Sequence, residues 1–310
     1  MIIDGDGHYC GMLSGGCLEG DLVERARAVI GTGESQTATY NLGADDELWG
    51  LGVGCDGTMR VLLQPLTRET DYQPFTAIAD TLQRGHSATI AIVVRAETPS
   101  IEVGASVVFQ ETERLCFGMS DEVAASIAND VDDSEITATR HVHTPEARCT
   151  VLYASIEPPP SVLVLGAGPD SEPVVRMASE LGWRCTVCDH RPAYIENRPY
   201  PDPTDKLCVA AEELSDRVDL KSFDMAIVMS HHLASDRAYL RQLGVTNIGY
   251  IGLLGPAGRR DRLMNELPEV ADALLGRLHG PAGIDLGGRG PGPIALAIVA
   301  EMQQYLFKRG

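Results

Sequence analysis

One segment, residues 161–189, constrains the fold more than any other part of this chain. It begins with an apolar, β-branched run, turns at residues 166–168, and continues as a helix from about Ser171 to a stop at Gly182. Asp189 then closes a second apolar strand, roughly 20 residues after the glycines. Such a unit is typical of a nucleotide-binding parallel sheet, in which an acid at this position accepts a hydrogen bond from a ribose.

Short apolar segments recur after this unit, and helical segments separate most of them. They are Cys185–Cys188, Leu207–Ala210, Ala226–Met229 and Ile248–Leu253. The alternation predicts an α/β fold, a Rossmann-like doubly wound parallel sheet with strand order 3-2-1-4-5 and ligands at the carboxyl ends of its strands. A glycine-rich loop over 280–292 and a helix over Ile294–Phe307 complete this half.

The preceding half is predicted to be a separate α/β domain. An amphipathic helix follows Cys17, and the later strands and helices carry no motif. A strand at Thr150–Ile156 leads into three prolines at 158–160, a rigid run typical of a boundary. We therefore expect domains over 1–157 and 158–310.

The glycine turn itself is a poor match to a dinucleotide site. Gly166 and Gly168 fit the fingerprint, but Ser171 stands at the third glycine position. A helix N-terminus attracts phosphate through its free N–H groups and partial positive charge, whereas here Pro169 has no N–H and two acids, at 170 and 172, oppose an anion. These residues disfavour a diphosphate here, and a Rossmann-like fold kept as a scaffold is the alternative.

A second candidate anion site follows the fifth strand of this half. Gly255 allows close backbone approach, and Arg259, Arg260 and Arg262 bring positive charge to the next helix. The alternative is a solvated arginine face that offsets nearby acids.

Polar residues also follow the fourth strand, beside the expected crevice. Ser230 and His231 are candidate ligand contacts, and a histidine there can donate a hydrogen bond or a proton. The alternative for either His231 or His232 is a structural cap.

Two of the eight cysteines stand out by context. Cys17 lies where a Gly-Gly turn meets a helix N-terminus, a position that favours a thiolate, and Cys55 lies in a glycine-rich loop. Thiolates at these positions suit a soft metal or sulfur transfer, and core packing is the alternative. Cys185 and Cys188 are three apart in a predicted strand, so they face opposite sides and are assigned to the core.

The charge balance excludes some partners. With 44 acidic and 25 basic residues the net charge is −19, which disfavours nucleic acid and anionic membranes. Only three of the basic residues are lysines, a pattern that suggests a halophilic source. We find neither a bilayer-spanning apolar run nor a signal peptide, so we expect a cytoplasmic protein with reduced thiols.

Taken together, these motifs resemble the XdhC/CoxI family, the xanthine dehydrogenase accessory proteins. The resemblance covers nearly the whole chain and is specific in the order and combination of its parts. The matching segments are 13–20, 52–57, 164–168, 187–191, 229–231 with Asp236, 250–255 with Arg259 and Arg260, and 279–287.

The resemblance implies an N-terminal XdhC/CoxI domain, a C-terminal Rossmann domain and an accessory function. Such proteins bind the molybdenum cofactor (molybdopterin), a pterin with a phosphate and a dithiolene-held metal. They protect it while a cysteine desulfurase supports its sulfuration, and they insert it into a xanthine dehydrogenase-type molybdoenzyme. A homodimer is expected.

Laid over the matched positions, the chemistry of the residues suggests their roles. Cys17 and Cys55 become cofactor-contacting thiols and candidate molybdenum contacts. Gly255, Arg259 and Arg260 become a phosphate site. The crevice is formed by Gly166, Gly168, Asp189, Ser230 and His231.

The sequence also departs from the family pattern. It begins after the helix and loop that usually precede the first strand, so part of the first domain is expected to be missing, supplied by another chain or lost to a misplaced start. Residues 54–57 read Gly-Cys-Asp-Gly where Gly-Cys-Gly-Gly is commoner.

Two alternatives to the chaperone function stay open. One is an NAD(P)-dependent oxidoreductase, with Asp189 on the ribose and His231 as proton donor. The other is a regulator whose Rossmann domain is empty.

Overall fold

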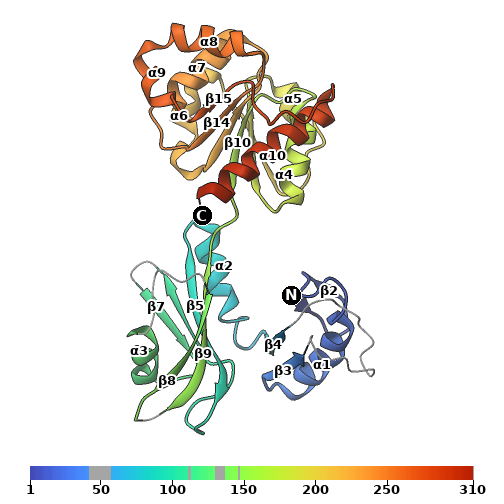
Figure 1. Cartoon of the computed structure of the whole chain (residues 1–310), viewed down its shortest axis with the longest axis vertical. Helices are drawn as coiled ribbons and strands as arrows, with labels where there is room; N and C mark the ends of the chain where they lie inside the picture. Colours follow the sequence, from blue (N-terminus) through green and yellow to red (C-terminus); the bar gives the residue numbers. More distant parts are fainter. Residues whose placement is uncertain (42–56, 111–112, 130–136, 146, 310) are drawn as a thin grey trace. The chain divides into compact units, whose positions relative to one another are not determined.

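A computed structural model describes residues 1–41, 57–110, 113–129, 137–145 and 147–309. The chain divides into two compact units, Met1–Pro158 and Pro159–Gly310 (Figure 1). No helix in the described ranges combines the length and the apolar run that a membrane span requires.

The first unit begins with two short antiparallel strands and one long helix. Strand β1 (Ile2–Ile3) pairs with β2 (Tyr9–Cys10), and helix α1 (Glu19–Thr32) follows. The antiparallel pair β3 (Gln36–Asn41) and β4 (Thr58–Leu63) shares a small core with α1, formed by Leu18, Leu22, Ala26, Val29, Ala38, Tyr40 and Leu63.

A five-stranded antiparallel sheet forms the rest of this unit. Its order is β7-β6-β5-β9-β8, from β5 (Ala88–Ala96), β6 (Ser106–Gln110), β7 (Glu113–Phe117), β8 (Thr137–His143) and β9 (Arg148–Ile156). Alternate residues of β5 belong to different cores, because successive side chains of a strand point to opposite faces. Helix α3 (Asp121–Asn129) packs with Ala91 and Val93, and α2 (Phe75–Gln83) packs with Ile90 and Ile92 on the other face.

The second unit contains the predicted parallel sheet. Its order is β12-β11-β10-β13-β14-β15, from β10 (Ser161–Leu165), β11 (Arg184–Asp189), β12 (Thr204–Cys208), β13 (Met225–Val228), β14 (Tyr250–Leu253) and β15 (Leu278–His279). The first five strands confirm the predicted order 3-2-1-4-5, and β15 adds a sixth strand that the sequence pattern did not predict. The Rossmann-like fold class is thus confirmed.

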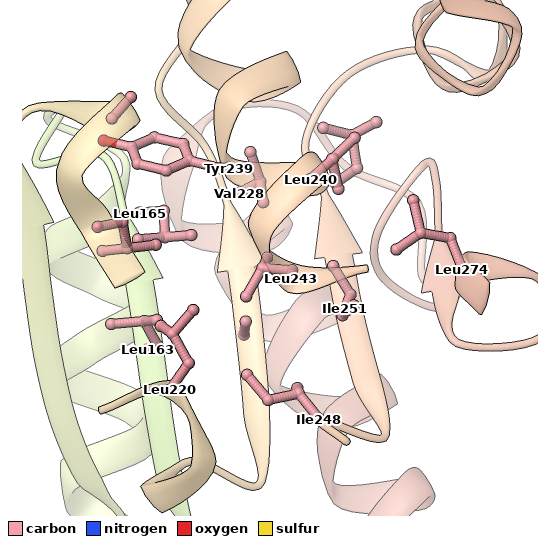
Figure 2. Packing of buried hydrophobic residues seen from close by; sticks show 14 of the residues in the cluster. Leu163, Leu165, Leu220, Val228, Tyr239, Leu240, Leu243, Ile248, Ile251 and Leu274 are labelled. Carbon is pink, nitrogen blue, oxygen red and sulfur yellow. The ribbon is translucent and has the colours of Figure 1, made fainter. Parts of the chain in front are cut away.

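Helices cover both faces of this sheet. They are α4 (Ser171–Glu180), α5 (Pro192–Glu196), α6 (Leu214–Arg217), α7 (Leu233–Leu243), α8 (Ala257–Glu266), α9 (Pro268–Leu274) and α10 (Pro291–Arg309). On one face, Leu163 and Leu165 pack against Tyr239, Leu240 and Leu243 of α7 (Figure 2). On the other, residues of α4 and α10 form a second core with β10 and β11.

The two cysteines of β11 show the two-sided burial directly. Cys185 belongs to the core that contains α4 and α10, and Cys188 to the core that contains α7. Burial raises the pKa of Cys185 to about 11 and that of Cys188 to about 12, so both thiols stay protonated at neutral pH. The assignment of this pair to the core is confirmed.

Candidate functional site

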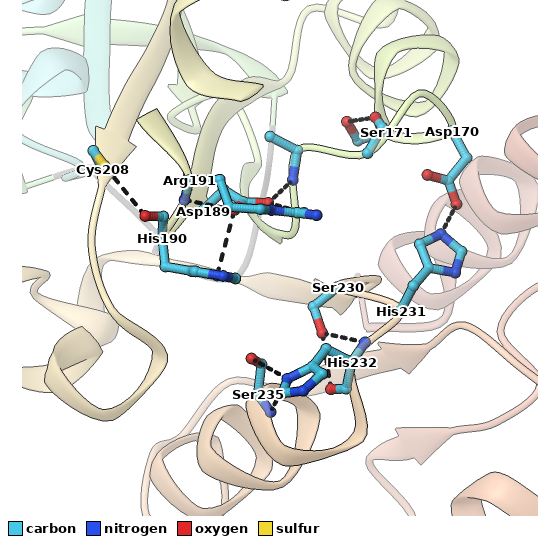
Figure 3. A network of polar contacts seen from close by, with 12 residues as sticks. Asp170, Ser171, Asp189, His190, Arg191, Cys208, Ser230, His231, His232 and Ser235 are labelled. Carbon is cyan, nitrogen blue, oxygen red and sulfur yellow. Dashed lines mark hydrogen bonds and ion pairs between the residues drawn. The ribbon is translucent and has the colours of Figure 1, made fainter. Parts of the chain in front are cut away.

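The carboxyl ends of the parallel strands place several predicted site residues along one edge of the sheet. Gly166 and Gly168 follow β10. Asp189 ends β11, and Ser230 and His231 follow β13 (Figure 3). This edge is where ligands bind in open α/β sheets, and the strand order reverses between β10 and β13.

Gly166 is required here by its backbone. Its φ is +123°, a conformation that favours glycine, and a Cβ atom on it would lie 2.6 Å from the Met229 carbonyl oxygen. The neighbouring strands therefore approach each other closely at this turn, which gives Gly166 a structural role.

Asp189 is buried and already engaged by donors of the protein. Its carboxylate accepts the Ala167 N–H at 2.7 Å and the Arg191 Nε and Nη2 at 2.8 and 2.7 Å. Burial raises the pKa of Asp189, but the hydrogen bonds from Arg191 and Ala167 outweigh it and leave the pKa below its usual value. Both carboxylate oxygens are thus occupied at the position expected for a ribose acceptor.

Ser230 belongs to a buried network that reaches helix α8. Its hydroxyl donates to Asp236 Oδ1 at 2.5 Å, and Arg259 donates to Asp236 Oδ2 from Nε at 2.8 Å and from Nη2 at 2.5 Å. The Asp236 side chain is 1% exposed and that of Arg259 is 23% exposed. Two hydrogen bonds from one guanidinium group compensate the charge of the buried carboxylate, so Arg259 is engaged by Asp236.

The other arginines of the predicted anion site have internal acceptors as well. Arg260 donates to Asp261 Oδ1 and, at 2.8 Å, to the Gly280 carbonyl, and Arg262 donates to Glu266. A Cβ at Gly255 would lie 2.8 Å from Arg259 Cδ, so this glycine gives room to the Arg259 stem. The structure therefore favours the solvated and internally paired arrangement over an open phosphate site.

His231 forms a pair with an acid of the glycine turn. Its Nε2 lies 2.7 Å from Asp170 Oδ2, and its φ of +59° places it in the left-handed region, which is uncommon for a residue with a side chain. The ring is 59% exposed. Asp170 Oδ1 is buried and has no hydrogen-bond partner among the described residues.

The Asp170 pairing fixes a testable tautomer. An ionised carboxylate only accepts, so His231 Nε2 carries a hydrogen toward Asp170, and in the neutral ring Nδ1 is the acceptor. Asp170→Ala should convert this single tautomer into a mixture, which nitrogen NMR of the ring measures. Because the His231 ring is 59% exposed and water screens its bond to Asp170, the free energy of unfolding should change by less than about 1 kcal/mol. A single Nε2–H tautomer that persists in Asp170→Ala would contradict this assignment, and His86→Ala serves as the control for assigning signals.

His232, by contrast, is a cap. Its Nδ1 accepts the Ser235 N–H at the start of α7 and contacts the Ser235 hydroxyl at 3.0 Å. The structural interpretation of a strand-end histidine therefore holds for His232.

In the first unit, Cys17 lies on an exposed loop organised by a buried acid. Glu19 Oε1 accepts the N–H groups of Leu13 and Ser14, and Oε2 accepts those of Gly16 and Leu18 together with the Ser14 hydroxyl at 2.6 Å. Bonds from the Ser14 hydroxyl and N–H, then from Leu13, lower the pKa of Glu19 to about 2. The loop is therefore shaped around an ionised carboxylate, and it leaves Cys17 exposed.

Glu19 was missed by sequence reasoning. An acid in the first turn of a helix is ordinarily attributed to the helix dipole, and only its position just after a Gly-Gly loop hinted at another use. The N–H groups around Cys17 that sequence reasoning left free for a thiolate are largely bonded to this carboxylate. Cys55 lies outside the described residues.

Comparison with known proteins agrees with this architecture. Residues 162–302 match the family described as XdhC Rossmann domain, and residues 1–41 match the XdhC and CoxI family. A protein of Bacillus subtilis (strain 168) that is named as a probable subunit of xanthine dehydrogenase is 29% identical over 308 residues, covering 98% of this chain and 86% of that protein.

Two further relatives are similar over different lengths. The crystal structure of a xanthine dehydrogenase from Bacillus halodurans superimposes with a TM-score of 0.78 at 29% identity, covering 99% of this chain and 86% of that one. The uncharacterized protein YqeB of Escherichia coli (strain K12) is 25% identical over 148 residues, 47% of this chain and 27% of YqeB.

Proposed function

This chain belongs to the XdhC and CoxI family, and we propose that it is an accessory protein that carries the molybdenum cofactor to a xanthine dehydrogenase-type molybdoenzyme. The family match and the names of the two Bacillus relatives support an accessory role. The observation that carries the proposal furthest is the exposed thiol of Cys17 on a loop held by Glu19.

A pre-shaped thiol loop suits a cargo that contains a soft metal. Thiolates are soft ligands, whereas carboxylates suit hard ions such as Mg²⁺ and Ca²⁺, and a loop whose backbone is already bonded loses little freedom on binding. We assign Cys17 to the metal end of the cargo, with Cys55 as its proposed second thiol.

The proposed partners follow from the same role. A cysteine desulfurase would supply sulfur while the cargo is held, and a homodimer would present two such loops. In this proposal the protein binds and transfers without turnover of its own.

An NAD(P)-dependent oxidoreductase is the competing function, and the geometry gives it less support. Asp189 would have to release Arg191 and the Ala167 N–H to bond a ribose. Within the part of the chain that the structure describes, the Asp170–His231 pair is a feature that suits proton transfer.

Titration of the purified full chain separates the two. Molybdopterin, NAD and NADP are titrated in parallel by fluorescence or calorimetry, and saturable binding of molybdopterin is expected. Saturable dinucleotide binding without pterin binding would overturn the accessory function.

A cysteine substitution tests the carrying observation. Cys17→Ala should weaken molybdopterin binding by about tenfold or more, which corresponds to losing one metal-type contact. Cys10→Ala is the matched control, because Cys10 is also an exposed thiol of the first unit. Equal molybdopterin affinity in the two variants would show that Cys17 does not contact the cofactor.

A further inference from the structure

Two arginine guanidinium groups lie near the ring of Tyr194, a tyrosine that follows β11. The Arg191 guanidinium carbon is 3.8 Å from the centroid of the Tyr194 ring, and that of Arg198 is 5.4 Å from the same centroid. Arginine over an aromatic face is favourable, but two guanidinium groups that share one ring repel each other. An anion bound to both guanidinium groups would offset this repulsion.

The two arginines differ in how their charge is compensated. Arg191 is bidentate to Asp189 through Nε and Nη2, which leaves its Nη1 hydrogens without a role in that bond. No carboxylate of the described residues lies within ion-pair distance of Arg198, although the chain carries 44 acids against 25 bases. An uncompensated, half-buried arginine is unusual in so acidic a chain.

The acids that seemed to exclude an anion from the neighbouring glycine turn are already paired. Asp170 is bonded to His231, and Glu172 is bonded to Arg176. The amino end of α4 adjoins this region through the Ser171 hydroxyl, which lies 2.6 Å from the Tyr200 hydroxyl. Arg176 compensates the charge of Glu172, so the electrostatic objection to an anion at this end of the sheet rests on Asp170 alone.

We propose that Arg191 and Arg198, which both contact the Tyr194 ring, form a binding site for a phosphomonoester group at the carboxyl end of β11. Guanidinium groups present paired donors that match phosphate oxygens, and a dianion satisfies two of them at once. The site differs from the Gly255 loop in Arg198: each arginine of that loop pairs with an acid, whereas Arg198 has no ion-pair partner among the described residues. It deepens the proposed function by locating the phosphate of the cargo, and it rests on that function only for the identity of the ligand.

The test uses the full chain and thermal unfolding at constant ionic strength. Inorganic phosphate, titrated against chloride, should raise the unfolding temperature of the native chain, because it binds the folded state. Arg198→Ala should weaken the apparent phosphate affinity by about tenfold or more. Arg217→Ala, an exposed arginine at the end of α6, should leave it unchanged. Equal phosphate stabilisation of the two variants would overturn the site.

Two further titrations identify the source of the phosphate. If Arg198→Ala binds molybdopterin more weakly than Arg217→Ala does, the site holds the phosphate of the cargo. If NADP binds more tightly than NAD and this difference depends on Arg198, the site holds a nucleotide phosphate. Molybdopterin that binds both variants equally overturns the assignment of the site to the phosphate of the cargo and leaves the accessory function standing. Phosphate binding that depends on Arg198 in a chain that does not bind molybdopterin overturns the function and leaves the site standing.

Discussion

Arg259→Met should lower the free energy of unfolding of the second unit by about 3 kcal/mol, because it leaves Asp236 buried and charged without its partner. The stem of methionine fills part of the space of the arginine, so most of the loss comes from the uncompensated carboxylate. Arg259→Lys should lose less, since it keeps the charge and gives up the paired donors of the guanidinium. Urea unfolding followed by circular dichroism measures the free energy of unfolding of the native protein, Arg259→Met and Arg259→Lys.

The matched control for this experiment is Arg262→Met. Arg262 lies on the same helix, is 62% exposed and pairs with Glu266, so its loss should change the unfolding free energy by less than about 1 kcal/mol. If Arg259→Met were as stable as Arg262→Met, Arg259 would be free to bind a ligand, and the sequence-based phosphate site at Gly255 would regain support.

Glu19→Gln should disorganise the loop that presents Cys17. An amide offers one acceptor oxygen in place of two and turns its NH2 group toward backbone donors, so at least two N–H groups of the loop lose their acceptor. Hydrogen exchange of the loop amides should accelerate by about tenfold or more, and molybdopterin affinity should fall with it. Glu24→Gln is the control, because it makes the same chemical change on the same helix at a side chain that is 70% exposed.

This effect has a defined pH dependence. Because folding lowers the pKa of Glu19 from 4.5 to about 2, its contribution to stability is complete above pH 4.5 and disappears as the pH falls toward 2. The urea midpoints of the native protein and Glu19→Gln should therefore differ above pH 4.5 and converge near pH 2. A difference in urea midpoint that stays constant over this pH range would show that the charge of Glu19 does not contribute to stability.

The parallel half of the fold could be predicted from sequence because its strands are buried on both faces. Continuous apolar runs mark β10, β13 and β14, and glycine and proline mark the ends of α4. Strands β3 and β8 escaped prediction because they are rich in polar residues, and β7 because it is short and begins with two charged residues. Their pairing depends on neighbours that no local pattern reveals.

The candidate site was predictable in position and less so in chemistry. Strand ends can be located from apolar runs, so the placing of Ser230 and His231 at the carboxyl edge followed from topology. Their partners did not, because Asp170 is 61 residues from His231. Partner choice decides which arginines stay available, and that is why the sequence alone indicated the arginines after β14 and did not single out Arg198.

The close approach of Gly166 to the backbone of Met229 and Ser230 links two loops that a ligand would otherwise contact independently. The Asp170–His231 bond joins the same two loops a few residues further on. A ligand that shifts the turn after β10 would therefore be expected to shift the turn after β13 as well, because the two backbones are already in close contact. The two loops are therefore expected to respond to a ligand as one unit, because Gly166 and the Asp170–His231 bond hold them together.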